Sequence, residues 1–120
     1  MLRHQNLVAW QRADDLFIRL HKLASERFPS SERFELGSQL RRAAYSVPAN
    51  IVEGVARRSA AQQRHFLNIA EASLAEAAYC LHVARRLGYI AQPEFLELDA
   101  EIQGVYAPLS GLLRHIKETG

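Results

Sequence analysis

Hydrophobic residues recur every three or four positions along most of this 120-residue chain, and no stretch shows the sustained alternation of a β-strand. This spacing predicts four α-helices, over about Leu7 to Arg27, Glu32 to Arg57, Ser59 to Gly88, and Pro93 to Ile116. Helices of this length joined by short loops favour an all-α fold, an antiparallel up-down four-helix bundle. We expect this bundle to form a single domain over residues 1–120.

Turn and capping signals separate the four segments. Pro29 interrupts the pattern after the first segment, and Ser59 with Gln62 matches a capping box at the start of the third. Gly88 is a C-terminal stop signal for that segment, and Pro93 is a favoured first-turn residue for the last. These signals support the boundaries that the hydrophobic spacing predicts.

Two prolines fall inside predicted helices. Pro48 lies in the sequence LRRAAYSVPANIVEG, where the apolar spacing continues from Val47 to Ile51 across the proline. Since proline lacks the N–H group of a helical hydrogen bond, the pattern predicts one helix that is kinked at Pro48. We expect Asn50 to bond backbone groups that are freed near this kink. In the last helix, Pro108 predicts a kink or a break.

The second and third predicted helices carry more apolar surface than one bundle core requires. A second apolar face of the second helix contains Tyr45, Ala49, Val52 and Ala56, and Tyr79 is a further candidate contact on the third. A helix that is apolar nearly all round is usually buried on more than one side. The pattern therefore predicts self-association through these helices, and the alternative is a surface that is merely rich in alanine.

Composition is that of a globular protein, with 48% hydrophobic and 23% charged residues, and the formal net charge is only +2. Arginine supplies nearly all the positive charge, in clusters that include Arg41 and Arg42, and Arg57, Arg58 and Arg64. Arginine is a good bidentate ligand of phosphate. A symmetric oligomer would repeat each cluster and so create a phosphate-binding surface. Solvated faces or salt bridges are the alternative roles of these arginines.

No pattern in the sequence indicates catalysis or metal binding. The chain has no Glu-x-x-His pair, no histidines four residues apart, and no glycine-rich phosphate loop. The single cysteine, Cys80, lies in an apolar stretch without a histidine positioned to activate it, and it is expected to be a core residue. The sequence therefore predicts a non-enzymatic protein with no catalytic residues, no metal and no cofactor.

The N-terminal sequence MLRHQNLVAW does not resemble a secretory signal peptide, and no segment approaches the length of a membrane span. We therefore expect a cytoplasmic protein with no membrane partner.

Four segments resemble the four-helix-bundle proteins of the ribosomal S23 type, which are also called 23S rRNA intervening-sequence proteins. They are LVAWQRADDL, FPSSERFELGSQLRRAAYSVPANIVEG, FLNIAEASLAEAAYCLHVARRLGYI and LSGLLRHI. The element from Leu40 to Gly54 is long and specific. The resemblance implies a ring-like homopentamer. A related branch, the accessory variability protein of diversity-generating retroelements, implies binding to RNA or DNA and to a reverse transcriptase.

If that use applies to this chain, the resemblance implies that Arg41, Arg42 and Arg57 contact nucleic acid. The motif positions with a structural role would then be Pro48, Asn50, Glu53 and Gly54. Proteins of the retroelement type are more basic than this chain, whose formal net charge is +2. A protein-interaction scaffold that binds no nucleic acid is therefore the alternative function.

Overall fold

The computed structural model describes residues 3–119, with side chains as far as Ile116. Within these residues every regular element is helical, and no strand occurs. The elements are the 3₁₀ helices η1 (Arg3–Asn6) and η2 (Ser30–Glu32) and the helices α1 (Val8–Arg27), α2 (Leu36–Ala56), α3 (Ala60–Arg86) and α4 (Gln92–Thr119). The prediction of an all-α fold is confirmed.

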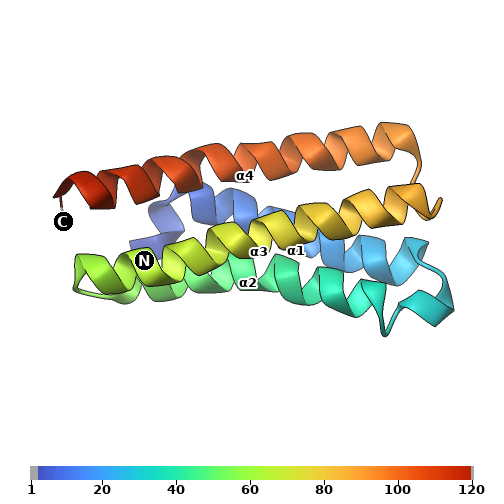
Figure 1. The fold of residues 1–120 in the computed structure, drawn as a ribbon, viewed down its shortest axis with the longest axis horizontal. Coiled ribbons are helices and arrows are strands. Elements are labelled where there is room, and N and C mark those ends of the chain that lie inside the picture. Colours follow the sequence, from blue (N-terminus) through green and yellow to red (C-terminus); the bar gives the residue numbers. More distant parts are fainter. Residues whose placement is uncertain (1–2, 120) are drawn as a thin grey trace.

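The four long helices run alternately up and down in an elongated bundle of 45 × 24 × 24 Å (Figure 1). Each helix packs against the next along the chain, and α4 returns to pack against α1. The predicted antiparallel up-down bundle is therefore confirmed. One consequence matters for the site: η1, the α2–α3 turn and the C-terminal turns of α4 lie towards the same end of the bundle (Figure 1).

The apolar stripes of all four helices meet in one core. The largest fully buried side chains are Leu20, Leu40, Val47, Ile51, Leu67, Leu74, Leu81, Leu98, Val105 and Leu109. Burying a side chain of this size stabilises the fold by roughly 1.5–3 kcal/mol. Cys80 also lies in this core, as the sequence predicts.

Two of the predicted helix boundaries have the expected capping geometry. The Ser59 hydroxyl accepts a hydrogen bond from the backbone N–H of Gln62 at 3.1 Å and caps the start of α3. After α3, Gly88 has φ +81°, a conformation that residues with a Cβ rarely adopt. The N–H of Tyr89 then donates to the carbonyl of Ala84 at 2.9 Å, which closes the last turn.

The helices pass through both internal prolines. The break expected at Pro108 is absent, because α4 is continuous from Gln92 to Thr119. Val105 and Leu109 are fully buried on either side of this proline, and their packing holds the helical register across the lost hydrogen bond. In α2, Pro48 is buried within a continuous helix, and its predicted kink stays a prediction.

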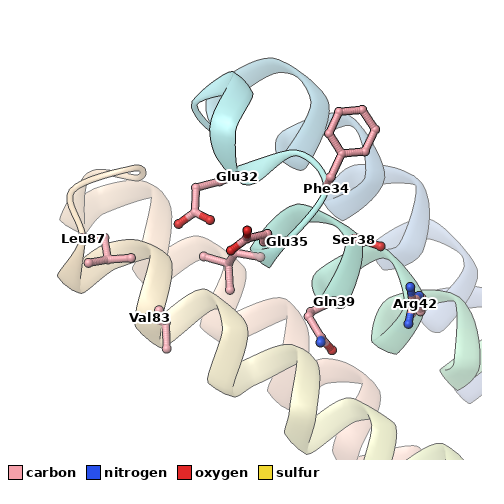
Figure 2. Close-up of a pocket in the computed structure, with 9 residues that line it drawn as sticks. Glu32, Phe34, Glu35, Ser38, Gln39, Arg42, Val83 and Leu87 are labelled. Carbon is pink, nitrogen blue, oxygen red and sulfur yellow. The ribbon is translucent and has the colours of Figure 1, made fainter.

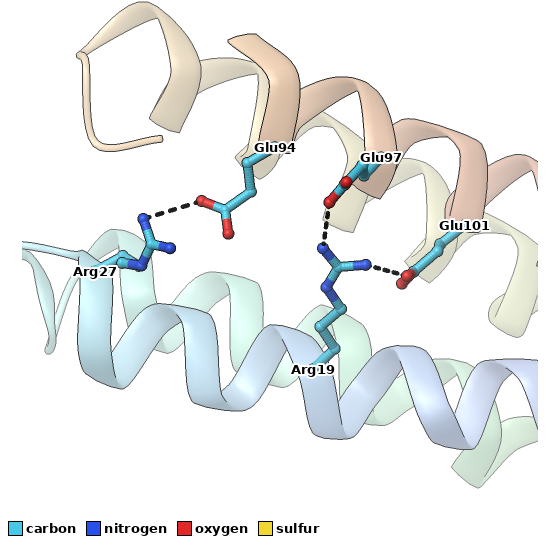
Figure 3. A network of polar contacts seen from close by, with 5 residues as sticks. All are labelled: Arg19, Arg27, Glu94, Glu97 and Glu101. Atoms are coloured by element: carbon cyan, nitrogen blue, oxygen red, sulfur yellow. Dashed lines mark hydrogen bonds and ion pairs between the residues drawn. The ribbon is translucent and has the colours of Figure 1, made fainter. Parts of the chain in front are cut away.

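Ion pairs join α1 to α4 along one side of the bundle (Figure 3). Arg19 bonds to Glu97 at 3.1 Å and also to Glu101, while Arg27 pairs with Glu94 at 3.3 Å. Partial burial lowers the pKa of Arg19, but the hydrogen bonds to the two glutamates outweigh this effect and raise it. The guanidinium groups of Arg19 and Arg27 therefore bind carboxylates of the bundle itself.

Candidate nucleic-acid interface

Arg57 is held firmly at the end of α2. Its guanidinium pairs with Glu53 at 2.7 Å and lies over the ring of Phe66, 4.8 Å from the centroid. Its backbone carbonyl accepts a hydrogen bond from Gln63 Nε2 at 2.9 Å. Glu53 thus acts as a structural partner of Arg57 and offsets part of its charge.

Arg58 and Arg64 flank the same α2–α3 turn without such partners. Arg58 is exposed and Arg64 is half-buried. No ion pair joins either side chain to a carboxylate within the described part of the chain. Their positive charge is therefore available to a ligand at this turn.

Two further arginines reach this end of the bundle from distant parts of the sequence. Arg3 lies in η1 and Arg114 in the C-terminal turns of α4, and both are exposed. A hollow of about 250 Å³, lined by Arg3, Gln63 and His115, confirms that these elements converge. We call the five arginines at this end the basic end, which comprises Arg3, Arg57, Arg58, Arg64 and Arg114.

The other predicted cluster lies far from the basic end. At a rise of 1.5 Å per residue, Arg42 precedes Arg57 by about 22 Å along α2. Arg41 donates from Nη2 to the backbone carbonyl of Arg33 at 2.6 Å. This bond fastens the turn before α2, whose first helical residue is Leu36 rather than the predicted Glu32. The structure therefore separates the two predicted arginine clusters.

Arg42 has acidic neighbours. It lines a hollow of about 480 Å³ together with Glu32, Glu35 and Phe34, as Figure 2 shows. The Glu32 carboxylate accepts a hydrogen bond from the Tyr89 hydroxyl at 2.8 Å, which raises the pKa of that phenol. Carboxylates repel phosphate, so this hollow suits an anion less well than the basic end does.

Asn50 links α2 to α3 through two serines. Its Nδ2 donates to the backbone carbonyl of Ser46 at 2.8 Å and to Ser46 Oγ at 2.9 Å. Ser73 Oγ on α3 donates to the same hydroxyl at 2.8 Å. The carbonyl that Pro48 leaves without a helical donor belongs to Ala44, so Asn50 bonds a neighbouring carbonyl instead of the freed one.

Replacing Asn50 with alanine is expected to lower the free energy of unfolding by about 1 kcal/mol, because Ser46 loses a part-buried hydrogen-bond partner. Urea denaturation measures this change. Asn68→Ala, at an exposed position on α3, is the matched control and should leave stability nearly unchanged. Equal stability of Asn50→Ala and the wild type would contradict a role for this linkage.

Three of the predicted oligomer contacts line one groove. Tyr45, Ala49 and Val52 lie along a hollow of about 370 Å³, which we call the α1–α2 groove. From α1, Trp10 and Phe17 complete its aromatic lining, and the rings of Phe17 and Tyr45 meet edge to face at 5.6 Å. Both residues belong to the core stripe of α1, so the sequence pattern gives no sign that they also line a groove.

The remaining predicted contacts lie outside this groove. Ala56 is exposed at the end of α2, and Tyr79 is 66% exposed on α3, where its ring stacks on His82. Tyr45, at the groove, is 59% exposed. Tyr45 forms a contiguous aromatic surface with Phe17, as contact surfaces do, whereas Tyr79 stands apart from that surface.

The described residues contain no group of three or more side chains suited to holding a metal ion. None of the described helices is long and apolar enough to cross a membrane. Burial, followed by the charge of Glu76, raises the pKa of the Cys80 thiol. A raised pKa disfavours the reactive thiolate at neutral pH.

We expect Cys80 in the folded protein to react slowly with iodoacetamide at neutral pH, and rapidly once urea unfolds the chain. Mass spectrometry of timed samples measures both rates. Labelling of the native protein as fast as that of the unfolded chain would contradict the burial of this thiol.

Comparison with known proteins places the chain among related bundles. The crystal structure of a protein with unknown function from the S23 ribosomal protein family of Bacteroides thetaiotaomicron VPI-5482 matches with a TM-score of 0.83. The match covers 89% of this chain and 96% of that chain at 22% identity, so it shows the fold alone. No curated protein matched. The model of the 23S rRNA-intervening sequence protein family matches residues 5–111, and the chain therefore belongs to this family.

Proposed function

We propose that this protein is a non-enzymatic, oligomeric accessory protein that binds nucleic acid, and RNA in particular, through its basic end. The observation that carries the proposal is that η1, the α2–α3 turn and the last turns of α4, which carry five arginines, meet at one end of the bundle (Figure 1). Among the described residues, only Arg57 of this group pairs with a carboxylate. Arginine binds phosphate bidentately, and an array of arginines suits a phosphate backbone.

The distribution of charge supports this proposal more than the net charge does. At the opposite end, Arg27 pairs with Glu94, and Arg42 shares a hollow with Glu32 and Glu35. Positive charge is therefore balanced there and concentrated at the basic end. The family takes its name from an intervening sequence of 23S rRNA, which favours RNA among the nucleic acids.

Self-association would bring one basic end from each copy into the same assembly. The α1–α2 groove and the exposed Tyr79 offer aromatic contact surface to a second copy. Asp14 also lines this groove, and an arginine of a second copy would complement its carboxylate. A ring, such as the homopentamer that the family resemblance implies, would repeat the arginines around one rim and strengthen phosphate binding.

Trp10 is the only tryptophan of the chain and lines the α1–α2 groove, so it reports directly on a second copy in this place. We expect light scattering to give a mass above that of one chain. On dilution, the mass should fall while the emission of Trp10 moves to longer wavelength. A single-chain mass at every concentration would contradict self-association.

Nucleic-acid binding is tested by fluorescence anisotropy of labelled mixed-sequence RNA and DNA over a series of salt concentrations. We expect affinity to fall steeply with salt, by about 0.7 log units per phosphate contact for each tenfold rise on single strands. No binding at low salt by an intact oligomer would refute the proposal.

An interaction scaffold is the second candidate function. The observation in its favour is that Arg19, Arg27 and Arg57 already pair with carboxylates of the bundle. If the protein is such a scaffold, it does not bind nucleic acid, and substitution of its exposed arginines dissociates the oligomer. The anisotropy and light-scattering measurements on the same sample therefore separate the two functions.

A further inference from the structure

The hollow at the basic end is a small, partly apolar cavity with one arginine, Arg3, in its lining. Its volume is about 250 Å³, below the roughly 300–1,000 Å³ of sites that take drug-sized ligands or cofactors. Its walls come from the end of α2, the start of α3, the C-terminal turns of α4 and the segment between η1 and α1. We call this cavity the end hollow.

Half-buried aliphatic side chains form much of the wall of the end hollow. Leu7, Val55 and Leu112 pack against the core on one side and line the cavity on the other. They leave apolar surface that a flat, weakly polar group would cover. A nucleobase that has left its stack is such a group, because its faces are apolar and its edges are polar.

Polar side chains line the same cavity. Gln63 is fixed by its hydrogen bond from Nε2 to the carbonyl of Arg57 at 2.9 Å, so its amide is held in one orientation. Arg3 and His115 also line the cavity. Together these groups can meet the donors and acceptors on the edge of a base.

We propose that the end hollow takes one unstacked base of a single-stranded nucleic acid, while the arginines of the basic end bind the adjoining phosphates. The inference rests on the proposed function and narrows its ligand class from nucleic acids in general to single strands. A duplex keeps its bases paired and stacked, and extracting one costs energy. Single strands therefore bind more tightly than duplexes with equal numbers of contacted phosphates.

The test compares two short single-stranded DNA strands of equal length, one with all its bases and one fully abasic, by anisotropy with the intact oligomer. Both carry the same phosphates, so the two salt slopes should agree. The strand with bases should bind about tenfold more tightly, since contacts to a single base commonly contribute about 5- to 150-fold.

The second part of the test uses a variant whose side chain fills the end hollow. Leu112→Trp should occupy the end hollow and reduce the affinity for the strand with bases to that for the abasic strand. Leu96→Trp, at an exposed position on α4, is the matched control and should retain the difference. The wild-type protein alone shows whether the two strands differ in affinity. This measurement therefore tests whether a base is bound even if Leu112→Trp does not fold.

Each outcome has a distinct meaning. Tighter binding of the strand with bases, lost in Leu112→Trp and kept in Leu96→Trp, is the expected result. Equal, salt-sensitive affinity for both strands would overturn the base-binding role and leave the proposed function standing. No binding of either strand or of RNA at low salt would overturn both. A base-dependent difference that persists in a folded Leu112→Trp would place the base outside the end hollow.

Discussion

Replacing Arg58, Arg64 and Arg114 together with alanine is expected to weaken the binding of single-stranded nucleic acid by roughly a hundredfold at low salt. These side chains lie at the basic end and pair with no described carboxylate. If each contacts one phosphate, the slope of log affinity against log salt loses about 2 units, because each contact on a single strand contributes about 0.7. Anisotropy titrations at several salt concentrations measure both effects.

The matched control removes three exposed arginines from the other end of the bundle, Arg33, Arg42 and Arg86. Both triple variants change the formal net charge from +2 to −1, since each loses three positive charges (2 − 3 = −1). The control should lose much less affinity than the basic-end variant. Equal losses would show that overall charge, rather than the basic end, determines binding, and would return Arg42 to the candidate contacts.

Replacing Gly54 with leucine is expected to lower the free energy of unfolding by about 3 kcal/mol through overpacking. A Cβ on this residue would lie 3.1 Å from Leu67 Cγ and 3.3 Å from the carbonyl oxygen of Gln63. Leu67 is fully buried, so the new side chain must displace part of the core. Urea denaturation, followed by circular dichroism, measures the change.

Gly104→Ala is the control for this substitution. Nothing lies within 4 Å of a Cβ at Gly104, although the residue is also in the middle of a helix. Alanine should therefore stabilise the protein here by about 0.5–1 kcal/mol, because it has the higher helix propensity. If Gly54→Leu were as stable as the wild type, the close approach of α2 and α3 at Gly54 would be contradicted.

Local patterns predict most of this fold. Apolar spacing locates the four helices, Ser59 marks the start of α3, and Gly88 marks its end. Of the kink or break predicted at Pro108, the break does not occur, because intrinsic propensity omits the buried neighbours that keep α4 continuous. The kink stays a prediction. Tertiary packing commonly overrides propensity in this way.

The candidate site depends more strongly on tertiary structure. Arg57, Arg58 and Arg64 are close in sequence, so their cluster is visible before folding. Arg3 and Arg114 join them only because the up-down topology brings η1 and the last turns of α4 to the end of the bundle that holds the α2–α3 turn (Figure 1). An up-down bundle of four helices already implies that the first and last segments lie near the α2–α3 turn. Both residues could therefore have been selected from the predicted topology.

The bonding partners of individual arginines are not visible in the sequence. Arg41 and Arg57 have the same apparent role in the motif, yet one fastens a turn and the other pairs with Glu53 and covers Phe66. Such roles depend on side-chain directions set by the packed helices. Only the structure therefore distinguishes exposed cations from those that support the fold.

The most direct test of the central claim is ultraviolet cross-linking of bound RNA to the intact oligomer, with the cross-linked peptides identified by mass spectrometry. The basic end predicts cross-links in segments 3–7, 55–64 and 111–116, which meet at one end of the bundle. Cross-links confined to segments 33–42 and 83–87, at the opposite end, would contradict the claim.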